Sequence, residues 1–240
     1  MGQTHGPKRE PLRGYDVVVT NPQATVQDYL TALNLAIETL PLTRRRLLPP
    51  PGQGQIPSDQ RLYCRGCDRC CRERVPLTYI DALKLIQATS SPSLGLFLRR
   101  YGYIWVQGRA VDISLAWEKQ AQGASAHPDR RCVFLNPETQ TCQVYRARPL
   151  VCQTFICCPQ TRRARRLREV IVNQGEDELV RQWLAEAAAT GREPEFHEGY
   201  NPRPREEDWP PTPFSGRTDY QEVRLKEICS PRLWEKLLGP

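Results

Sequence analysis

The sequence of 240 residues lacks a run of about 18 apolar residues, so nothing in it is expected to span a membrane. Its first residues, MGQTHGPKRE, contain no apolar stretch after their charges, which argues against a secretory signal. We therefore expect a cytoplasmic protein, in a compartment where thiols are kept reduced. Cysteines in that setting indicate metal ligands or catalytic groups before they indicate disulfides.

The common catalytic signatures are missing as well. There is no P-loop, no GxSxG nucleophile elbow and no GxGxxG dinucleotide fingerprint. The 3 histidines do not lie in a HExxH or CxxCH context, and none is close enough in sequence to activate a cysteine nucleophile. The CxxxCxxC arrangement of radical S-adenosylmethionine enzymes is also absent, because position 74 is Arg. These enzyme classes are therefore disfavoured.

What the sequence does contain is cysteine, gathered in one stretch. Nine of the 10 cysteines lie between positions 64 and 158. The run CRGCDRCC at 64–71 has two C-x-x-C gaps in succession, a spacing that lets tight turns direct several sulfurs at one ion. Because thiols flanked by arginine do not resemble core positions, we predict that the nine bind metal. The tenth, Cys229, stands alone in a C-terminal helix pattern and is expected to be a small buried hydrophobic residue.

Adjacent cysteines bear on the number of sites. Side chains of neighbouring residues diverge, so Cys70 and Cys71 are not expected to share one tetrahedral ion. The same reasoning applies to Cys157 and Cys158. This geometry favours two sites with four ligands each, and a single site with additional reactive thiols is the alternative.

The stretch CVFLNPETQTCQVY is expected to form a second cysteine-bearing element, a hairpin with its tip at 136–138. In that register Cys132 faces Cys142, and directly opposed residues on one face have Cβ atoms roughly 5 Å apart. A shift of one residue would place the two on opposite faces. The predicted register brings both sulfurs within reach of one metal.

The net charge of +7 is concentrated on the same part of the chain. Between positions 61 and 168 there are 19 Lys and Arg against 7 Asp and Glu, an excess of 12. Cations near thiolates stabilise their negative charge, which explains part of this excess. The run TRRARRLRE at 161–169 is expected to form a basic helix that contacts nucleic-acid phosphates or neutralises the thiolates. We favour the second role, because the run lacks aromatic residues for base stacking.

Apolar periodicity predicts a mainly helical chain. Capping boxes at Thr25 with Asp28 and at Thr78 with Asp81 predict two helix starts. The expected helices cover 25–40, 78–90, 93–101, 176–190 with Gly191 as its end, 218–228, and a segment from Ser230 onward. YIWVQGRAVDI is predicted to be a hairpin that turns around Gln107 and Gly108, and 168–172 a strand. The proline-rich stretch 193–213 should lack regular structure and wrap the domain through Trp209 and Phe214.

The expected fold class is therefore α+β, a small and mainly helical metal-chelating domain. In it, short β-hairpins present the cysteine ligands, and the flanks are irregular and rich in proline. We divide the chain into 1–60, an amphipathic helix and a proline-rich linker; 61–191, the cysteine-cluster metal-binding domain; and 192–240, a proline-rich wrapping segment with C-terminal helices. The apolar face of the helix at 25–40 is expected to pack in the core or against a partner. Detached by its linker, this helix is a candidate docking surface for a protein partner, and so is the acidic, proline-rich tail.

The segments CRGCDRCC, VPLTYID and CVFLNPETQTCQVYRARPLVCQTFICC together resemble the zinc- or iron-chelating cysteine-cluster family, the CxxCxxCC or YkgJ-type proteins. The likeness covers residues 64–158. It implies a small metal-chelating domain with the ligands Cys64, Cys67, Cys70, Cys71, Cys132, Cys142 and Cys152, together with one or both of Cys157 and Cys158.

Thiolates suit both zinc and iron–sulfur clusters, so the ligands leave the metal open. The successive two-residue gaps resemble a ferredoxin run and Cys158-Pro159 resembles its terminal Cys-Pro, although Cys71 interrupts the order. Cys132 and Cys142 do not have the spacing of zinc knuckles. We therefore favour an iron–sulfur cluster over zinc and expect a role in redox chemistry or protein maturation and assembly. A structural zinc protein that binds nucleic acid or another protein is the alternative.

Overall fold

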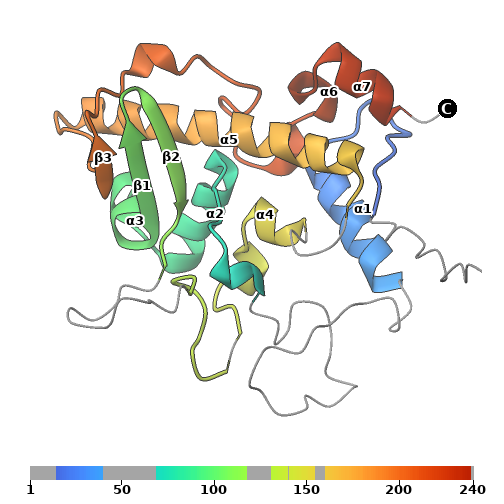
Figure 1. Cartoon of the computed structure of the whole chain (residues 1–240), viewed down its shortest axis with the longest axis horizontal. Helices are drawn as coiled ribbons and strands as arrows, with labels where there is room; N and C mark the ends of the chain where they lie inside the picture. The colour runs from blue at the N-terminus through green and yellow to red at the C-terminus, as the bar shows by residue number, and fades with distance from the viewer. Residues whose placement is uncertain (1–14, 40–68, 118–130, 140, 155–159, 239–240) are drawn as a thin grey trace, which may run out of the picture.

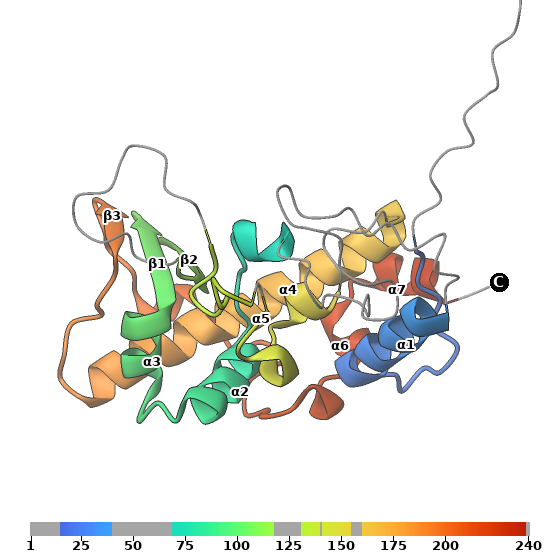
Figure 2. The same cartoon turned by 90° about the horizontal axis from the view of Figure 1, so that it is seen from below.

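The computed structural model describes residues 15–39, 69–117, 131–139, 141–154 and 160–238, and these form an α+β fold, as predicted. The long helix α5 (Arg162–Ala189) crosses the molecule, and the other elements pack along it (Figure 1). The sheet lies near the C-terminal end of α5, whereas α1, α6 and α7 lie near its N-terminal end, as Figure 2 also shows. No helix in the described ranges is long and apolar enough to cross a membrane.

Within these ranges the remaining helices are α1 (Val26–Thr39), α2 (Tyr79–Thr89), α3 (Leu94–Tyr101), α4 (Leu150–Gln153), α6 (Leu225–Ile228) and α7 (Pro231–Leu237). The strands are β1 (Gly102–Gln107), β2 (Ala110–Leu115) and β3 (Glu198–Tyr200), in the order β2-β1-β3. Short 3₁₀ helices are η3 (Arg69–Arg72), η4 (Tyr145–Ala147), η5 (Glu206–Asp208) and η6 (Tyr220–Glu222).

Capping side chains set the helix starts where the sequence predicted them. The backbone N of Thr25 donates to Asp28 Oδ2 at 2.8 Å, and the backbone N of Asp28 donates to Thr25 Oγ1 at 3.2 Å. Thr78 and Asp81 form the same reciprocal pair at the start of α2, which ends at Ser90 in the left-handed conformation. Such caps satisfy backbone donors that no helical carbonyl reaches, so these short sequence patterns predict helix starts well.

The predicted hairpin of β1 and β2 is confirmed. The strands are antiparallel with Gln107 opposite Ala110, which leaves Gly108 and Arg109 as a two-residue loop. Gly108 has a φ of 57°, a conformation that glycine adopts without a steric penalty. The parallel strand β3, inside the proline-rich stretch, was not predicted; it pairs Trp105 of β1 with Glu198.

The prediction of a strand at 168–172 is wrong, because these residues lie inside α5. The β-branched run Val170, Ile171 and Val172 favours a strand by propensity alone. In the structure Leu167 and Ile171, four positions apart, are both fully buried on one face of the helix. Burial along this face outweighs a propensity difference of less than about 1 kcal/mol per residue. The helix ends as expected before Gly191, whose φ is 63°.

The helix α1 belongs to the core, so the expectation that it is detached is wrong. Val26, Leu30 and Leu33 are at most 5% exposed and join the same hydrophobic cluster as residues of α2, α5 and α7. The backbone N of Val26 donates to the carbonyl of Val223 at 2.9 Å. The apolar face that we expected to meet the core or a partner is thus covered by this chain's own C-terminal part.

The expectation that the proline-rich stretch lacks regular structure is wrong, because it contains β3 and η5; Phe214 is fully buried and Trp209 partly buried. The attachment of this stretch to α5 includes the buried carboxylate of Glu178. This carboxylate accepts hydrogen bonds from Arg181 Nη2 at 2.5 Å and Ser215 Oγ at 2.5 Å. A buried charge with such partners does not incur the large cost of an unpaired one, so the contact fixes the wrapping segment on α5.

Gly175 marks a close approach of α5 to the start of α2. A Cβ at this position would lie 2.6 Å from both Cβ and Cγ2 of the buried Thr78. We expect Gly175→Ala to lower the free energy of unfolding by about 1–3 kcal/mol, as overpacking does. Urea denaturation measures the change. Gly95→Ala in α3, where only the movable carboxylate of Glu186 lies within 4 Å, should show no comparable loss; equal losses would contradict the explanation.

Glu176 of α5 provides a hydrogen-bond acceptor for a backbone N–H group at the edge of β2. Its Oε1 accepts a hydrogen bond from the backbone N of Ile113 at 2.8 Å. Burial raises the pKa of Glu176 from its ordinary 4.5 to about 8; the carboxylates of Asp112 and Asp177 add to the rise, and the Ile113 N–H opposes it. Between these two pKa values the folded chain holds a proton that the unfolded chain has released.

We therefore expect the contribution of Glu176 to stability to be complete below about pH 4.5 and to be lost as the pH rises toward about 8. One such group changes the free energy of unfolding by about 1.4 kcal/mol per pH unit within this window. Glu176→Gln keeps an acceptor for Ile113 and has no proton to lose, so it should flatten the slope. Urea denaturation across this pH range tests it, with Glu207→Gln at an exposed carboxylate as the control. An unchanged slope in Glu176→Gln would assign the effect to other groups.

Candidate metal centre

The structure places some of the predicted ligands and not others. Cys71, Cys132, Cys142 and Cys152 are described with their side chains, and Cys70 as part of η3. The remaining predicted ligands, Cys64, Cys67, Cys157 and Cys158, lie outside the described residues. Within the described ranges alone, no group of three or more His, Cys, Asp or Glu side chains is arranged to hold a metal ion.

Two cysteine segments that are distant in sequence lie directly beside each other. The backbone N of Cys132 donates to the carbonyl of Cys71 at 2.6 Å. Cys132 also forms an isolated antiparallel bridge with Trp117, two residues after the end of β2, and Val133 N donates to the Ala116 carbonyl at 3.0 Å. The end of the hairpin thus holds residue 132 against η3, which carries Cys70 and Cys71.

The predicted register of the 132–145 segment is wrong. Cys142 pairs with Leu135 rather than with Cys132. The Oδ1 atom of Asn136 accepts hydrogen bonds from the backbone N of Glu138 and of Thr139, and this side-chain turn lengthens the loop beyond the predicted tip. As a result, Cys132 and Cys142 are carried by isolated bridges, and the β1–β2 hairpin carries no cysteine.

The segment between η3 and α2 is fixed on the sheet. The guanidinium carbon of Arg74 lies 4.8 Å from the centre of the Tyr103 ring and 5.3 Å from that of Trp117. Leu115 N donates to the Val75 carbonyl at 2.9 Å, which adds the segment to the free edge of β2. Cation–π contacts at exposed sites contribute about 0.5–1 kcal/mol each, so the backbone pairing and Arg74 together position the chain just after Cys71.

Cys152 lies on α4, a helix of 4 residues that follows Pro149. Pro149 occupies the position before the first helical residue and offers no side-chain cap. Instead, the backbone N of Leu150 donates to Asp81 Oδ1 at 2.8 Å, inside the core. A carboxylate from α2 therefore caps the helix that carries a predicted ligand.

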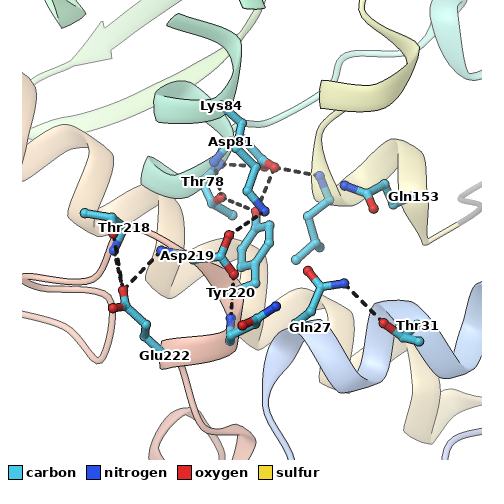
Figure 3. A network of polar contacts seen from close by, with 12 residues as sticks. Gln27, Thr31, Thr78, Asp81, Lys84, Gln153, Thr218, Asp219, Tyr220 and Glu222 are labelled. Atoms are coloured by element: carbon cyan, nitrogen blue, oxygen red, sulfur yellow. Dashed lines mark hydrogen bonds and ion pairs between the residues drawn. The ribbon is translucent and has the colours of Figure 1, made fainter. Parts of the chain in front are cut away.

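Asp81 is the centre of a buried polar network (Figure 3). Its Oδ1 also accepts from the hydroxyl of Tyr220 at 2.7 Å, and its Oδ2 accepts from Thr78 N at 3.1 Å. The hydroxyls of Thr78 and Tyr220 lie 2.6 Å apart. Burial raises the pKa of Asp81, and these donors oppose the rise. The sequence predicted Asp81 as a helix cap; its partners 69 and 139 positions away carry no local signal.

Tyr15 of the N-terminal segment contacts Thr154 and Thr161, which lie before and after Cys157 and Cys158 in the sequence. The hydroxyl of Tyr15 donates to the Thr154 carbonyl at 2.9 Å, and the Tyr15 carbonyl accepts from Thr161 N at 2.9 Å. These contacts hold residues 154 and 161 near one another. Sequence reasoning gave Tyr15 no role, since nothing near it in sequence resembles a site.

The thiols of the described cysteines are suitable ligands for zinc or iron. Thiolates are favoured ligands of both; Cys132 belongs to the hydrophobic cluster, and Cys71 and Cys152 are partly buried against it. Cys229 lies apart from these three, at the end of α6. It is buried in the C-terminal part, and burial raises the pKa of its thiol to about 11. It therefore fits its predicted role as a hydrophobic residue.

The predicted basic helix forms the first turns of α5. Arg162, Arg165 and Arg166 are exposed. Arg163 is paired with Asp16 at 2.5 Å, and Arg166 lies 3.4 Å from Glu169. The helical part of the prediction is confirmed, and nucleic-acid contact through this face stays a prediction.

Comparison with known proteins agrees with this pattern of cysteines. Residues 63–174 match the family model CxxCxxCC, described as "Putative zinc- or iron-chelating domain". No solved structure matches the chain. The matched segment contains the nine clustered cysteines and Asp81, and it ends within α5. Residues 63–174 are thus similar to the same family that the cysteine motif resembles.

Proposed function

We propose that residues 61–191 hold an iron–sulfur cluster, or iron or zinc ions, and serve in redox chemistry or in protein maturation. The ligands are drawn from Cys64, Cys67, Cys70, Cys71, Cys132, Cys142, Cys152, Cys157 and Cys158. The hydrogen bond between the backbones of Cys71 and Cys132 carries the proposal, because it brings two separated cysteine segments together.

The chain's own residues prepare such a centre in three ways. The pairing of Val75 with β2 fixes the exit of the CRGCDRCC segment, and the bridge to Trp117 fixes Cys132. Asp81 caps the helix of Cys152. Arg74, which contacts Tyr103 and Trp117, holds the chain just after the first cysteine group against the sheet. Preorganised ligands lose less conformational freedom when an ion binds, and affinity rises accordingly.

We favour an iron–sulfur cluster over zinc for the reasons that the sequence gives. The successive two-residue gaps at 64–70 resemble a ferredoxin run. When bound, such a cluster supplies electron transfer or an open iron for a substrate, whereas a structural zinc ion stabilises the fold. The resemblance of the domain to metal-chelating proteins supports either metal.

Metal analysis of the full chain tests the proposal. We expect protein purified without oxygen to contain iron and sulfide and to absorb near about 400 nm, where clusters bound by cysteine absorb. Elemental analysis and an ultraviolet–visible spectrum measure both. A colourless sample with stoichiometric zinc would replace the redox role with a structural one. A sample with neither metal, even after anaerobic reconstitution, would contradict the proposed function.

Substitution of Cys132 tests the ligand assignment. We expect Cys132→Ser to lose most of its bound metal and to unfold at a lower temperature, because a serine hydroxyl is a poor ligand for either metal. Cys67→Ser should behave alike. Cys229→Ser is the matched control: it also removes a buried thiol but should retain the full metal content. Full metal content in Cys132→Ser, measured after gel filtration, would show that this cysteine is not a ligand.

A further inference from the structure

The helix that carries Cys152 depends on contacts made elsewhere in the chain. A helix of 4 residues gains too few internal hydrogen bonds to offset the cost of its nucleation. Pro149 before it provides no side-chain cap, so the first amide of the helix, at Leu150, is satisfied by Asp81 at 2.8 Å. Leu150 and Asp81 are at most 1% exposed, and water does not replace this bond.

Asp81 is itself held by Tyr220, which lies on η6 near the C-terminus. The Tyr220 hydroxyl donates to the same oxygen, Oδ1, that caps Leu150, at 2.7 Å. Tyr220 is fully buried, and the ammonium of Lys84 lies 4.5 Å from the centre of its ring while it pairs with Asp219 at 3.3 Å. Lys84 thus contacts the ring, whereas Asp81 and Thr78 contact its hydroxyl (Figure 3).

We propose that Tyr220 is a positioning residue of the metal centre, which acts on the ligand Cys152 through Asp81 and the first turn of α4. The proposal rests on the proposed function and deepens it. Tyr220 lies outside the matched segment 63–174, so the family resemblance assigns it nothing. Its hydroxyl directs one oxygen of Asp81 at Leu150, and the cap in turn sets the direction in which α4 presents Cys152.

Removal of the hydroxyl should loosen the centre without removing a ligand. In Tyr220→Phe the ring keeps its packing, but Asp81 loses one of its donors inside the core and is no longer held in the orientation that caps α4. Outer hydrogen bonds that orient metal ligands typically change metal affinity by about 10–100-fold. Because Tyr220 acts through an intermediate carboxylate, we expect the low end, an affinity about tenfold weaker.

The experiment uses the full chain under reducing conditions, loaded with Zn²⁺ as the probe. Competition with a chromogenic chelator gives the dissociation constant of wild type and Tyr220→Phe. Tyr200→Phe removes a hydroxyl from a tyrosine that is 75% exposed and should leave the constant unchanged. Leu237→Ala, at a fully buried site in α7, supplies a variant that is destabilised without touching the network. It should retain wild-type affinity at temperatures at which it is folded.

Amide hydrogen exchange of the metal-free proteins provides a second readout. In Tyr220→Phe the Leu150 amide should exchange faster relative to the other core amides, whereas Leu237→Ala should not single it out. If Tyr220→Phe does not fold, Asp81→Asn takes its place; it keeps an acceptor for Leu150 without the charge and should weaken Zn²⁺ binding in the same direction.

The outcomes separate the two proposals. A wild-type chain that binds neither Zn²⁺ nor iron overturns the proposed function, and Leu150 exchange then still reports whether the network holds α4. A wild-type chain that binds Zn²⁺, together with a folded Tyr220→Phe of equal affinity, overturns only the role of Tyr220. Equal weakening in Tyr220→Phe and Leu237→Ala would also overturn it, because the loss would then follow stability alone.

Discussion

The arrangement of the core depends on one buried carboxylate, that of Asp81. Burial of an isolated ionised group is very costly, and Asp81 is tolerated in the core because backbone and side-chain donors from different parts of the chain surround it. Thr78 belongs to its own helix, Leu150 to the helix of Cys152, and Tyr220 to the C-terminal part. Each unmade bond in such a place costs about 1–3 kcal/mol, so these three segments can dock only in one relative arrangement.

That arrangement explains why the segments of Cys71 and Cys132 lie side by side. Asp81 lies in the first turn of α2. The residues Val75 and Pro76, which precede this helix, pair with β2. The end of β2 in turn receives Cys132, and Cys132 bonds to the backbone of Cys71. The contacts are made by main chain and by groups other than sulfur. The backbone of the scaffold thus brings the two cysteine segments together.

The sequence predicted the features that depend on neighbouring residues, and it missed those that depend on contacts between residues far apart in the chain. The caps at Thr25 and Thr78 and the turn at Gly108 depend on residues within a few positions, and each was found. The strand wrongly predicted at 168–172 lies in a helix because its buried face is decided by neighbours from other elements. The predicted pairing of Cys142 was wrong because the side chain of Asn136 forms a turn that lengthens the loop. Tyr220 gave no signal, since its role is defined only by where Asp81 lies.

The segment 63–174 that matches the CxxCxxCC model is not a complete folding unit in this chain. It ends at Gln174, in the middle of α5 and directly before Gly175, whose lack of a side chain lets α5 approach Thr78. Gln174 Nε2 donates to the Ile228 carbonyl of α6 at 3.0 Å, so even the last matched residue is bonded to a segment beyond the match. The core cluster further includes Leu30 of α1 and Phe214 of the wrapping stretch. In this protein the flanks therefore complete the core on which the cysteine segments are mounted, and the position of the cysteines is a property of the whole chain.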